Sequence, residues 1–332
     1  MKLKTPIKKR SVTKKCRKLI AIGDLHGDYY KLLRHLKENN LINKRLLNWN
    51  RKANNIDLVL LGDYVDWRGE KLEGDRKEWI KGSKRILLLL KSLYEQIEIL
   101  NKNKNFNSNI YLLFGNHDDM MLNGLDIFNV FFAWELEEIL EGFIGIRDAG
   151  KLYAYKKLNE SETETVNNFL NWFVQGGRET IVSFGSFDEW KDEMEGDLGN
   201  FLREKLKLAC IVDKTLLCHS ISDLQKYWRS DIIINKRFID FEKNDPIKRE
   251  FLWGRKLWEM DYKTGGCAEP FKKVEIEKLI KNFNIDEVVV GHTPLKNDSI
   301  KRYYEGKVIN LDFHGSVLSP AYIRKYKSGI SR

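Results

Sequence analysis

Proline and cysteine are scarce in this chain. Its 332 residues include 5 prolines and 4 cysteines, and we find no long linker, low-complexity segment or internal repeat. The cysteines form no CxxC pair and lack the spacing of zinc ligands, which argues against a disulfide framework; they are Cys16, Cys210, Cys218 and Cys267. We therefore expect a reducing compartment, the cytoplasm.

Long apolar runs are absent as well. The longest aliphatic run, Ile86–Leu90, is far too short to span a bilayer. The N-terminal segment is basic but lacks the apolar stretch of a signal peptide. We expect a soluble protein without a membrane partner, in which residues 1–17 form a basic, mobile leader. No composition break separates domains, so we expect residues 18–328 to form a single domain with helical insertions.

The composition allows a sizeable core and gives the chain a positive charge. Hydrophobic residues make up 42% and aromatic residues 12%, which is ample for one or two domains. Lysine and arginine total 58 against 48 acidic residues, a formal net charge of +10. A basic surface attracts phosphorylated partners and nucleic acid. Much of the excess positive charge lies between Lys2 and Lys18, however. A charge without a binding role is therefore the stronger interpretation, and nucleic-acid contact is the weaker one.

Three apolar runs in the first third of the chain each lead into a short polar segment. Residues 19–22 precede GDLHG at 23–27, residues 58–61 precede GDYVD at 62–66, and residues 110–114 precede GNHD at 115–118. Helices are expected after the first run and over 83–100, so the order is β-α-β-α-β, typical of a parallel sheet layered with helices. Sites in such sheets form outside the carboxyl ends of the strands, and these segments carry Asp, His and Asn. They predict a dinuclear metal site.

The rest of the chain adds helices and further strand ends. Helices are expected over 119–140, 161–174, 198–208 and 271–283, and strands over 210–212, 215–218, 288–290, 308–311 and 322–326. A single histidine after a strand is more often structural than functional. Five of the six histidines occupy that position, which favours metal ligation; they are His26, His117, His219, His292 and His314.

Four motifs in order carry a family resemblance. GDLHG, GDYVD, GNHD and GHTP (291–294) resemble the ordered motifs of the phosphoprotein phosphatase family of calcineurin-like metallophosphoesterases. This family includes serine/threonine phosphatases and diadenosine tetraphosphatases. Residues 171–185 and the segment Leu252–Arg255 further resemble its bacterial and bacteriophage-type branch. The resemblance implies an α/β fold, with a central β-sandwich flanked by helices and a dinuclear metal site at strand-end loops.

The resemblance also implies two divalent metal ions and their ligands. Carboxylate, amide and imidazole ligands suit manganese, iron or zinc, and we expect manganese. In the implied arrangement, Asp24 and His26 bind the first metal and Asp63 bridges both metals. The second site is completed by Asn116, His219 and His292.

Four further residues are implied to act on the phosphate ester. His117 donates a proton to the leaving oxygen and is held by Asp66, while Arg68 and Arg255 bind the phosphate. The family has arginine directly after the second aspartate of GDxVD, whereas here Trp67 intervenes. Either a bulge still lets Arg68 reach the phosphate, or this contact has moved and specificity has changed. His314 is an additional residue, for which we expect a surface or packing role.

Three functions compete. The leading hypothesis is a phosphatase for phosphoserine and phosphothreonine in proteins, in which a metal-activated water attacks phosphate directly. The alternative substrates are dinucleoside polyphosphates or RNA 5′ ends, for which the loop 67–82, with its arginines and tryptophans, offers charge and stacking contacts. A catalytically inactive binding module is the third hypothesis, and the complete set of metal and acid residues argues against it.

Overall fold

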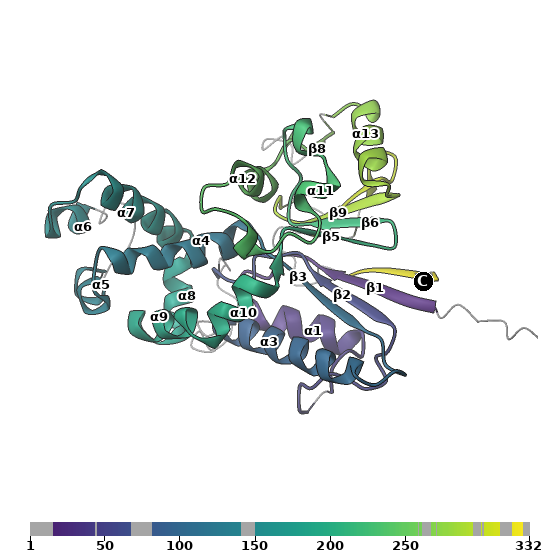
Figure 1. The fold of residues 1–332 in the computed structure, drawn as a ribbon, viewed down its shortest axis with the longest axis horizontal. Helices are drawn as coiled ribbons and strands as arrows, with labels where there is room; N and C mark the ends of the chain where they lie inside the picture. The colour runs from purple at the N-terminus through teal and green to yellow at the C-terminus, as the bar shows by residue number, and fades with distance from the viewer. Residues whose placement is uncertain are drawn as a thin grey trace, which may run out of the picture.

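The computed structural model describes residues 16–43, 45–67, 82–140, 150–257, 259–260, 267–269, 271–294, 300, 302–312 and 321–327. Two five-stranded sheets lie at its centre, in the orders β12-β1-β2-β3-β4 and β10-β11-β9-β6-β5 (Figure 1). Their strands are β1 (Cys16–Ile22), β2 (Ile56–Leu60), β3 (Asn109–Leu113), β4 (Leu206–Lys207), β5 (Ala209–Val212), β6 (Thr215–Cys218), β9 (Glu287–Val290), β10 (Arg302–Tyr303), β11 (Val308–Asn310) and β12 (Tyr322–Lys327). A separate pair joins β7 (Glu259–Met260) and β8 (Cys267–Ala268).

Helices cover both outer faces of the stacked sheets (Figure 1). On one side lie α1 (Tyr29–Glu38) and α3 (Gly82–Asn101), and on the other α11 (Ser230–Ile233), α12 (Pro246–Trp253) and α13 (Lys273–Phe283). The predicted α/β fold with a central β-sandwich is confirmed. None of the helices in the described ranges is long and apolar enough to cross a membrane. Strand β1 begins at Cys16, inside the segment expected to be a leader, and residues 1–15 lie outside the described residues.

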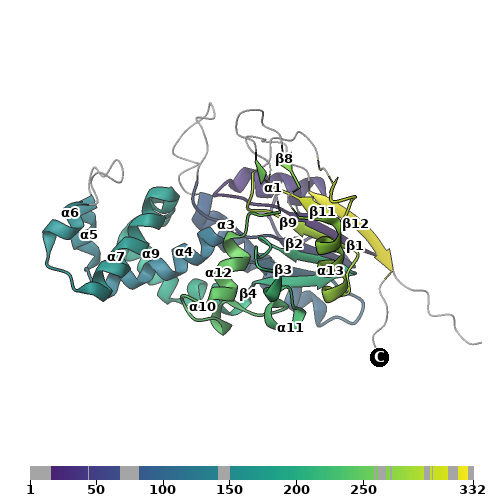
Figure 2. The ribbon, with the colours of Figure 1, turned by 90° about the horizontal axis from the view of Figure 1, so that it is seen from above.

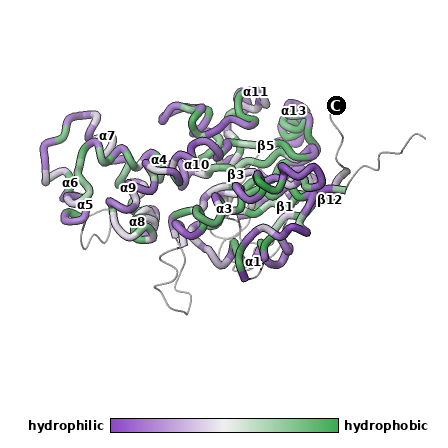
Figure 3. Tube along the Cα trace, turned by 60° about the horizontal axis from the view of Figure 1, so that its bottom comes forward, coloured by the Kyte–Doolittle hydropathy of each residue, from purple (hydrophilic) through white to green (hydrophobic). Residues whose placement is uncertain are grey.

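The strands are apolar on both faces because both faces are covered. Leu19 and Val59 of the first sheet lie in the layer between the sheets with Val289 of the second, and all three are fully buried. The alternate residues Ile20 and Leu58 face the helices instead. Continuous apolar runs are the expected pattern for strands buried on both sides. Figure 3 shows apolar segments along the strands and α3, with hydrophilic segments at the periphery.

Buried charges join the strands near their starts. Arg17 of β1 donates to both oxygens of Asp57 in β2, at 2.7 and 2.5 Å. Arg324 of β12 donates to Glu287 of β9 at 2.6 Å and so connects the two sheets. These bidentate or charge-assisted bonds offset the cost of burying the carboxylates. The charged groups at the strand starts leave the carboxyl ends of the strands available for the site described below.

A group of helices extends to one side of the sheets (Figures 1 and 2). It contains α4 (Asn116–Gly124), η1 (Leu125–Asn129), α5 (Ala133–Leu140), α6 (Gly150–Tyr155), α7 (Glu160–Trp172), η3 (Phe173–Gly177), α8 (Arg178–Phe184), α9 (Phe187–Glu195) and α10 (Asp197–Lys205). We call α4 to α9 the helical arm. Short 3-10 helices follow at η4 (Gln225–Tyr227) and η5 (Phe238–Asp240). The assignment of residues 18–328 to one domain stays a prediction.

Three predicted boundaries were wrong. The helix expected over 119–140 is interrupted by η1 and by residues 130–132. The helix expected over 198–208 ends at Lys205, because residues 206–207 pair with β3 as strand β4. Sequence reasoning also placed Asn116 and His117 in a loop, whereas they form the first turn of α4. Tertiary contacts with the sheet and arm decide these ends, and local periodicity does not encode them.

Candidate metal centre

Five strand ends from both sheets converge on one set of side chains. Strands β1, β2 and β3 are parallel neighbours, and so are β6 and β9. The carboxyl ends of parallel strands lie at the same edge of a sheet, where ligand sites form. The structure places all six predicted ligands there: Asp24 and His26 after β1, Asp63 after β2, Asn116 after β3, His219 after β6 and His292 after β9.

Three of these side chains surround one ring nitrogen of a fourth, His219. Nε2 of His219 lies 3.0 Å from Oδ1 of Asn116, 3.2 Å from Nδ1 of His292 and 3.6 Å from Oδ2 of Asp63. Nitrogen and oxygen ligands bind a transition-metal ion at about 2.1 Å, so neighbouring ligand atoms are about 3.0–3.4 Å apart. The spacing of these donor atoms therefore fits a single divalent cation.

A second group of donors shares Asp63 with the first. Oδ2 of Asp63 lies 3.6 Å from Nε2 of His26, the same distance that separates it from His219. Ring nitrogens of His26 and His117 come within 4.8 Å of each other and of the Asp63 carboxylate. One carboxylate oxygen thus faces two groups of potential ligands, which is the arrangement that a bridging ligand requires.

Asp24 carries a buried oxygen without a hydrogen-bond partner among the described residues. Its Oδ2 accepts the backbone N–H of His292 at 2.9 Å, while Oδ1 has no hydrogen-bond partner among the described residues. Burial raises the pKa of Asp24 to about 6, although the neighbouring His219 opposes the rise and Asp63 adds to it. An unpaired buried carboxylate oxygen is costly unless a cation compensates it. Asp24 therefore fits a metal ligand.

His219 is held in the tautomer that binds metal, and His292 is held neutral. Nδ1 of His219 donates to the backbone carbonyl of Leu61 at 3.0 Å, which leaves the lone pair on Nε2. Burial lowers the pKa of His219, and burial beside His219 and Arg255 lowers the pKa of His292 well below its usual value. Both imidazoles are thus neutral, and neutral imidazole is a common transition-metal ligand.

The backbone of these loops adopts conformations that side chains rarely allow. His26, Asp63, Asp66 and His292 have φ angles of 43°, 49°, 68° and 65°. Left-handed backbone at non-glycine residues stores strain and clusters at functional sites. A Cβ atom at Gly115 would lie 2.1 Å from Oδ1 of Asp63, so only glycine lets the two loops approach this closely.

Sequence reasoning assigned no role to Asp118, which joins two of the loops. Its carboxylate accepts the backbone N–H groups of Asp63 at 2.7 Å, Tyr64 at 2.9 Å and Gly115 at 2.9 Å. Burial, reinforced by Asp63, raises the pKa of Asp118 well above its usual value, against the effect of the three amides. The sequence shows Asp118 within the GNHD motif. It does not show the hydrogen-bond partners of Asp118 that lie 54 and 55 residues away.

His117 pairs with Asp66 as the resemblance implies. Nδ1 of His117 and Oδ2 of Asp66 are 2.6 Å apart, and both side chains are buried. The ring of His117 lies edge-on to that of His26, with centroids 5.0 Å apart. A carboxylate at Nδ1 directs the other ring nitrogen of His117 away from Asp66, toward the donor groups.

Arg255 lies at the exposed side of the donor groups. Its Nε donates to Nε2 of His292 at 3.2 Å. Its backbone N–H donates to Oδ1 of Asp223 at 2.9 Å, and the Ser220 hydroxyl donates to the carbonyl of Gly254. Ser220, just after the end of β6, thus contacts the segment that carries Arg255. Arg68, His314 and most of the loop 67–82 lie outside the described residues, so their roles stay predictions.

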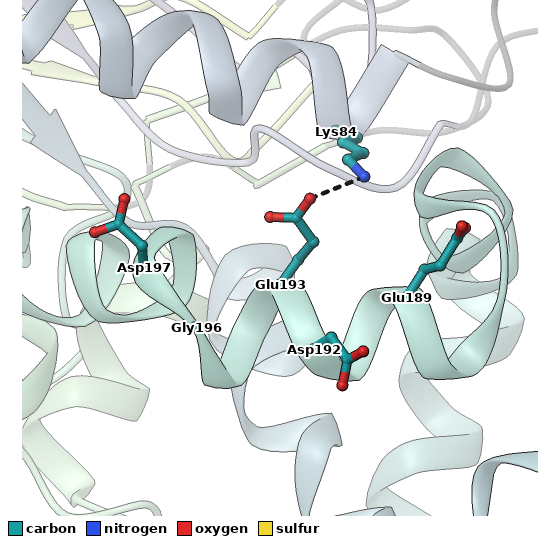
Figure 4. Close-up of a pocket in the computed structure, with 6 residues that line it drawn as sticks. All are labelled: Lys84, Glu189, Asp192, Glu193, Gly196 and Asp197. Atoms are coloured by element: carbon teal, nitrogen blue, oxygen red, sulfur yellow. Dashed lines mark ion pairs between the residues drawn. The ribbon is translucent and has the colours of Figure 1, made fainter.

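A separate cavity of about 320 Å³ lies between α3, α9 and α10 (Figure 4). It is lined by one lysine, one glycine and four carboxylates: Lys84, Gly196, Glu189, Asp192, Glu193 and Asp197. Lys84 pairs with Glu193 at 3.0 Å. The remaining negative charge disfavours a phosphate group there, and none of the predicted ligands lines this cavity.

Comparison with known proteins establishes the class. The sequence model of the calcineurin-like phosphoesterase family matches residues 17–296. The chain belongs to this family and is a phosphoesterase, a hydrolase whose members use divalent metal ions. No match is found among curated proteins.

One solved structure shares the fold, and two more are similar to the chain. A mutant of a cold-active protein tyrosine phosphatase is 18% identical, with a TM-score of 0.50, over 90% of this chain and 71% of that one. The cold-active protein-tyrosine phosphatase of a psychrophile, Shewanella sp., is also 18% identical, with a TM-score of 0.46, and has the same coverage. A Saccharomyces cerevisiae protein serine/threonine phosphatase is 18% identical, with a TM-score of 0.43, over 91% of this chain and 68% of that one.

Proposed function

We propose that this phosphoesterase hydrolyses phosphoserine and phosphothreonine monoesters in proteins. The observation that carries the proposal is the His117–Asp66 pair, 2.6 Å apart, beside two groups of metal ligands. A serine or threonine alkoxide is a poor leaving group, so its departure from phosphorus is slow without a proton donor. An imidazole held by a buried carboxylate supplies that proton.

The chain's own residues divide the reaction between binding and proton transfer. Arg255 binds non-bridging phosphate oxygens through charge-assisted hydrogen bonds. Water adds to phosphorus as the P–O bond to the serine or threonine oxygen breaks, and His117 transfers its proton to that departing oxygen. The products are the free hydroxyl and inorganic phosphate. Asp66 orients the imidazole and stabilises its protonated form.

We propose two divalent cations, with manganese as the preferred metal. Asp24 and His26 would bind one cation, Asp63 would bridge, and the second cation would take three ligands: Asn116, His219 and His292. When bound, the cations polarise phosphate oxygens and lower the pKa of water. Carboxylate, amide and imidazole donors suit manganese and also iron or zinc. Metal analysis of the protein purified without added metal, followed by reconstitution with each ion, tests the preference.

A nucleotide substrate is the second candidate, and Trp253 is the observation that favours it. Its ring is 37% exposed and lies edge-on to His292, with centroids 6.0 Å apart. An exposed indole beside a phosphate site can stack on a base, a contact worth about 1–3 kcal/mol. Dinucleoside polyphosphates and RNA 5′ ends therefore remain the alternative substrates.

Parallel assays separate the two candidates. The manganese-loaded protein is given a phosphoserine peptide, a phosphotyrosine peptide, diadenosine tetraphosphate and a 5′-triphosphorylated RNA, and kcat/KM is measured for each. The proposal predicts the highest value for the phosphoserine peptide. A diadenosine tetraphosphate or RNA value at least tenfold higher, lost in Trp253→Ala, would establish the nucleotide function instead.

We also propose a cytoplasmic location. Among the described cysteines, Cys210 and Cys218 carry free thiols and lie buried on the paired strands β5 and β6. Burial raises the pKa of the Cys210 thiol to about 12 and raises the pKa of the Cys218 thiol well above its usual value. These groups are therefore unreactive thiols of the kind that a reducing compartment preserves.

A further inference from the structure

The carboxylate of Asp66 is held by two residues of the helical arm. The indole N–H of Trp172, at the end of α7, donates to Oδ2 at 2.8 Å and lies 3.1 Å from Oδ1. The hydroxyl of Thr180, in α8, donates to Oδ1 at 2.7 Å. These partners lie 106 and 114 residues from Asp66 in the sequence. Both carboxylate oxygens therefore have a donor from the arm, in addition to His117.

We propose that Trp172 and Thr180 are positioning residues for acid catalysis: they fix Asp66, and through it the proton-donating imidazole of His117. This inference rests on the proposed function, because it requires His117 to act as the acid. It gives α7 and α8 a role in the chemistry, in addition to α4, the first helix of the arm, which carries Asn116 and His117.

The hydrogen bonds from the arm fix the orientation of the Asp66 carboxylate. Asp66, Trp172 and Thr180 are each fully buried, so water does not compete for these bonds and each is stronger than at a surface. Donors on both oxygens prevent the carboxylate from rotating away from the His117 ring.

The backbone between the two donors is shaped for this contact. The segment η3 connects α7 to α8 as a π-helix, and within it Gly176 has a φ angle of 117°. A Cβ atom at Gly176 would lie 2.9 Å from Cβ of Asp66. One at Gly177 would lie 2.6 Å from the Trp172 ring. Segments of π-helix are rare and often occur at functional sites, and here the extra residue brings the backbone against Asp66.

Thr180 connects this contact to the core as well. Its hydroxyl oxygen accepts the backbone N–H of Asp66 at 2.9 Å and lies 3.2 Å from the hydroxyl of Ser83, near the start of α3. One threonine thus contacts both the main chain and the side chain of Asp66. Such a double contact fixes the residue whose left-handed φ of 68° would otherwise be costly.

Trp172 also has an obvious packing role, which the test must separate from positioning. Its ring lies 5.0 Å from that of Trp190 and 6.0 Å from that of Phe169. Trp190 supplies a matched control: it is equally buried in the arm, and its indole N–H has no hydrogen-bond partner among the described residues. Replacing either tryptophan by phenylalanine removes one N–H and part of one buried ring.

The experiment measures kcat for a phosphoserine peptide and for p-nitrophenyl phosphate, whose leaving group needs little proton assistance. We compare the manganese-loaded wild type with four variants and measure the metal content of each. The variants are Trp172→Phe, Trp190→Phe, Thr180→Val and Thr180→Ser. Misplacing a catalytic group by about 1 Å costs up to about 100-fold. We expect Trp172→Phe and Thr180→Val to lower peptide kcat about 10- to 100-fold more than p-nitrophenyl phosphate kcat, with full metal content. Thr180→Ser should restore most of the loss, and Trp190→Phe should change both substrates by the same factor.

Two outcomes would contradict the inference in distinguishable ways. If His117→Asn selectively slows the peptide while Trp172→Phe and Thr180→Val slow both substrates equally, positioning by the arm is wrong and the proposed function stands. If His117→Asn itself slows both equally, acid catalysis fails and the inference fails with it. Should Trp172→Phe not fold, Thr180→Val and its serine rescue decide the question, since they remove and restore a single hydroxyl.

Discussion

The backbone N–H of His117 donates to Oδ1 of Asp63 at 3.0 Å, while Oδ2 of Asp63 faces both groups of predicted metal ligands. One carboxylate therefore contacts the main chain of the residue that we propose as the acid and also the centre of the proposed metal site. The position of the acid and the binding of metal are coupled through this side chain, so substitutions at Asp63 and at its supporting residues should affect both.

Asp63→Asn should lose metal as well as activity. An amide offers one oxygen and no negative charge, so two cations about 3.5–4 Å apart would repel each other with less compensation. Metal content measured after gel filtration should fall from two ions per chain to one or fewer, and kcat should fall with it. Two bound metals with near-normal turnover would rule out a bridging role for Asp63.

Asp118→Asn should destabilise the fold and weaken metal binding together. The carboxylate accepts three backbone N–H groups, and an asparagine NH₂ would face at least one of them. Each buried N–H left unpaired costs about 1–3 kcal/mol. Asp119→Asn is the control, because the Asp119 carboxylate pairs instead with Lys248 of α12 at 2.9 Å. Urea unfolding and metal titration should show reduced stability in both variants, but reduced metal affinity only in Asp118→Asn.

Arg255→Ala should weaken phosphate binding and leave the metals in place. The guanidinium lies beside His292 at the exposed side of the site, where it can form charge-assisted hydrogen bonds to phosphate. The inhibition constant for inorganic phosphate should rise about 10- to 150-fold, as the loss of a charged hydrogen bond worth about 1.5–3 kcal/mol implies. The neighbouring exposed residue supplies the control, Lys256→Ala. Equal inhibition of both variants and the wild type would make Arg255 a surface residue without a role in binding.

The stability of the fold should fall in acid because of His35. Burial, with Lys31 and Arg34 nearby, lowers the pKa of His35 from 6.5 to about 3. Above pH 6.5 the ring is neutral in both states. As the pH falls from 6.5 toward 3, the unfolded chain binds a proton that the folded chain does not, so the free energy of unfolding decreases.

His35→Phe should remove this contribution. Urea unfolding gives the free energy of unfolding of the metal-free wild type and variant between pH 7.5 and 4.5. The difference between the two proteins isolates the contribution of His35 from that of the other titrating groups. The wild type should lose stability relative to the variant below pH 6.5, with a slope of at most about 1.4 kcal/mol per pH unit. Parallel curves would show that His35 titrates normally in the folded state.

The strand ends were predictable from the sequence because physical rules constrain them tightly. Apolar runs such as 58–61 and 288–290 are short and end at glycine, and the carboxyl ends of parallel strands meet at one edge. The order of the motifs then placed Asp24, Asp63 and His292 together, although Gly291 is more than two hundred residues from the first motif.

The supports of the site were not predictable in the same way. The contacts of Asp66 with Trp172 and Thr180 join residues 106 and 114 positions apart, and no periodicity encodes such pairs. The helical path also continues through Gly176 as the π-helix η3, because glycine tolerates the unusual φ angle at that position. Tertiary contacts determine these features.

The most direct test of the account concerns His117. His117→Asn, loaded with manganese, is compared with the wild type on a phosphoserine peptide and on p-nitrophenyl phosphate, with metal content measured in the same samples. General acid catalysis supplies about 10²–10⁴-fold, so we predict a loss of that size with the peptide, a much smaller loss with p-nitrophenyl phosphate, and full metal content. Equal slowing of both substrates, accompanied by loss of metal, would instead make His117 a metal ligand and contradict the proposed mechanism.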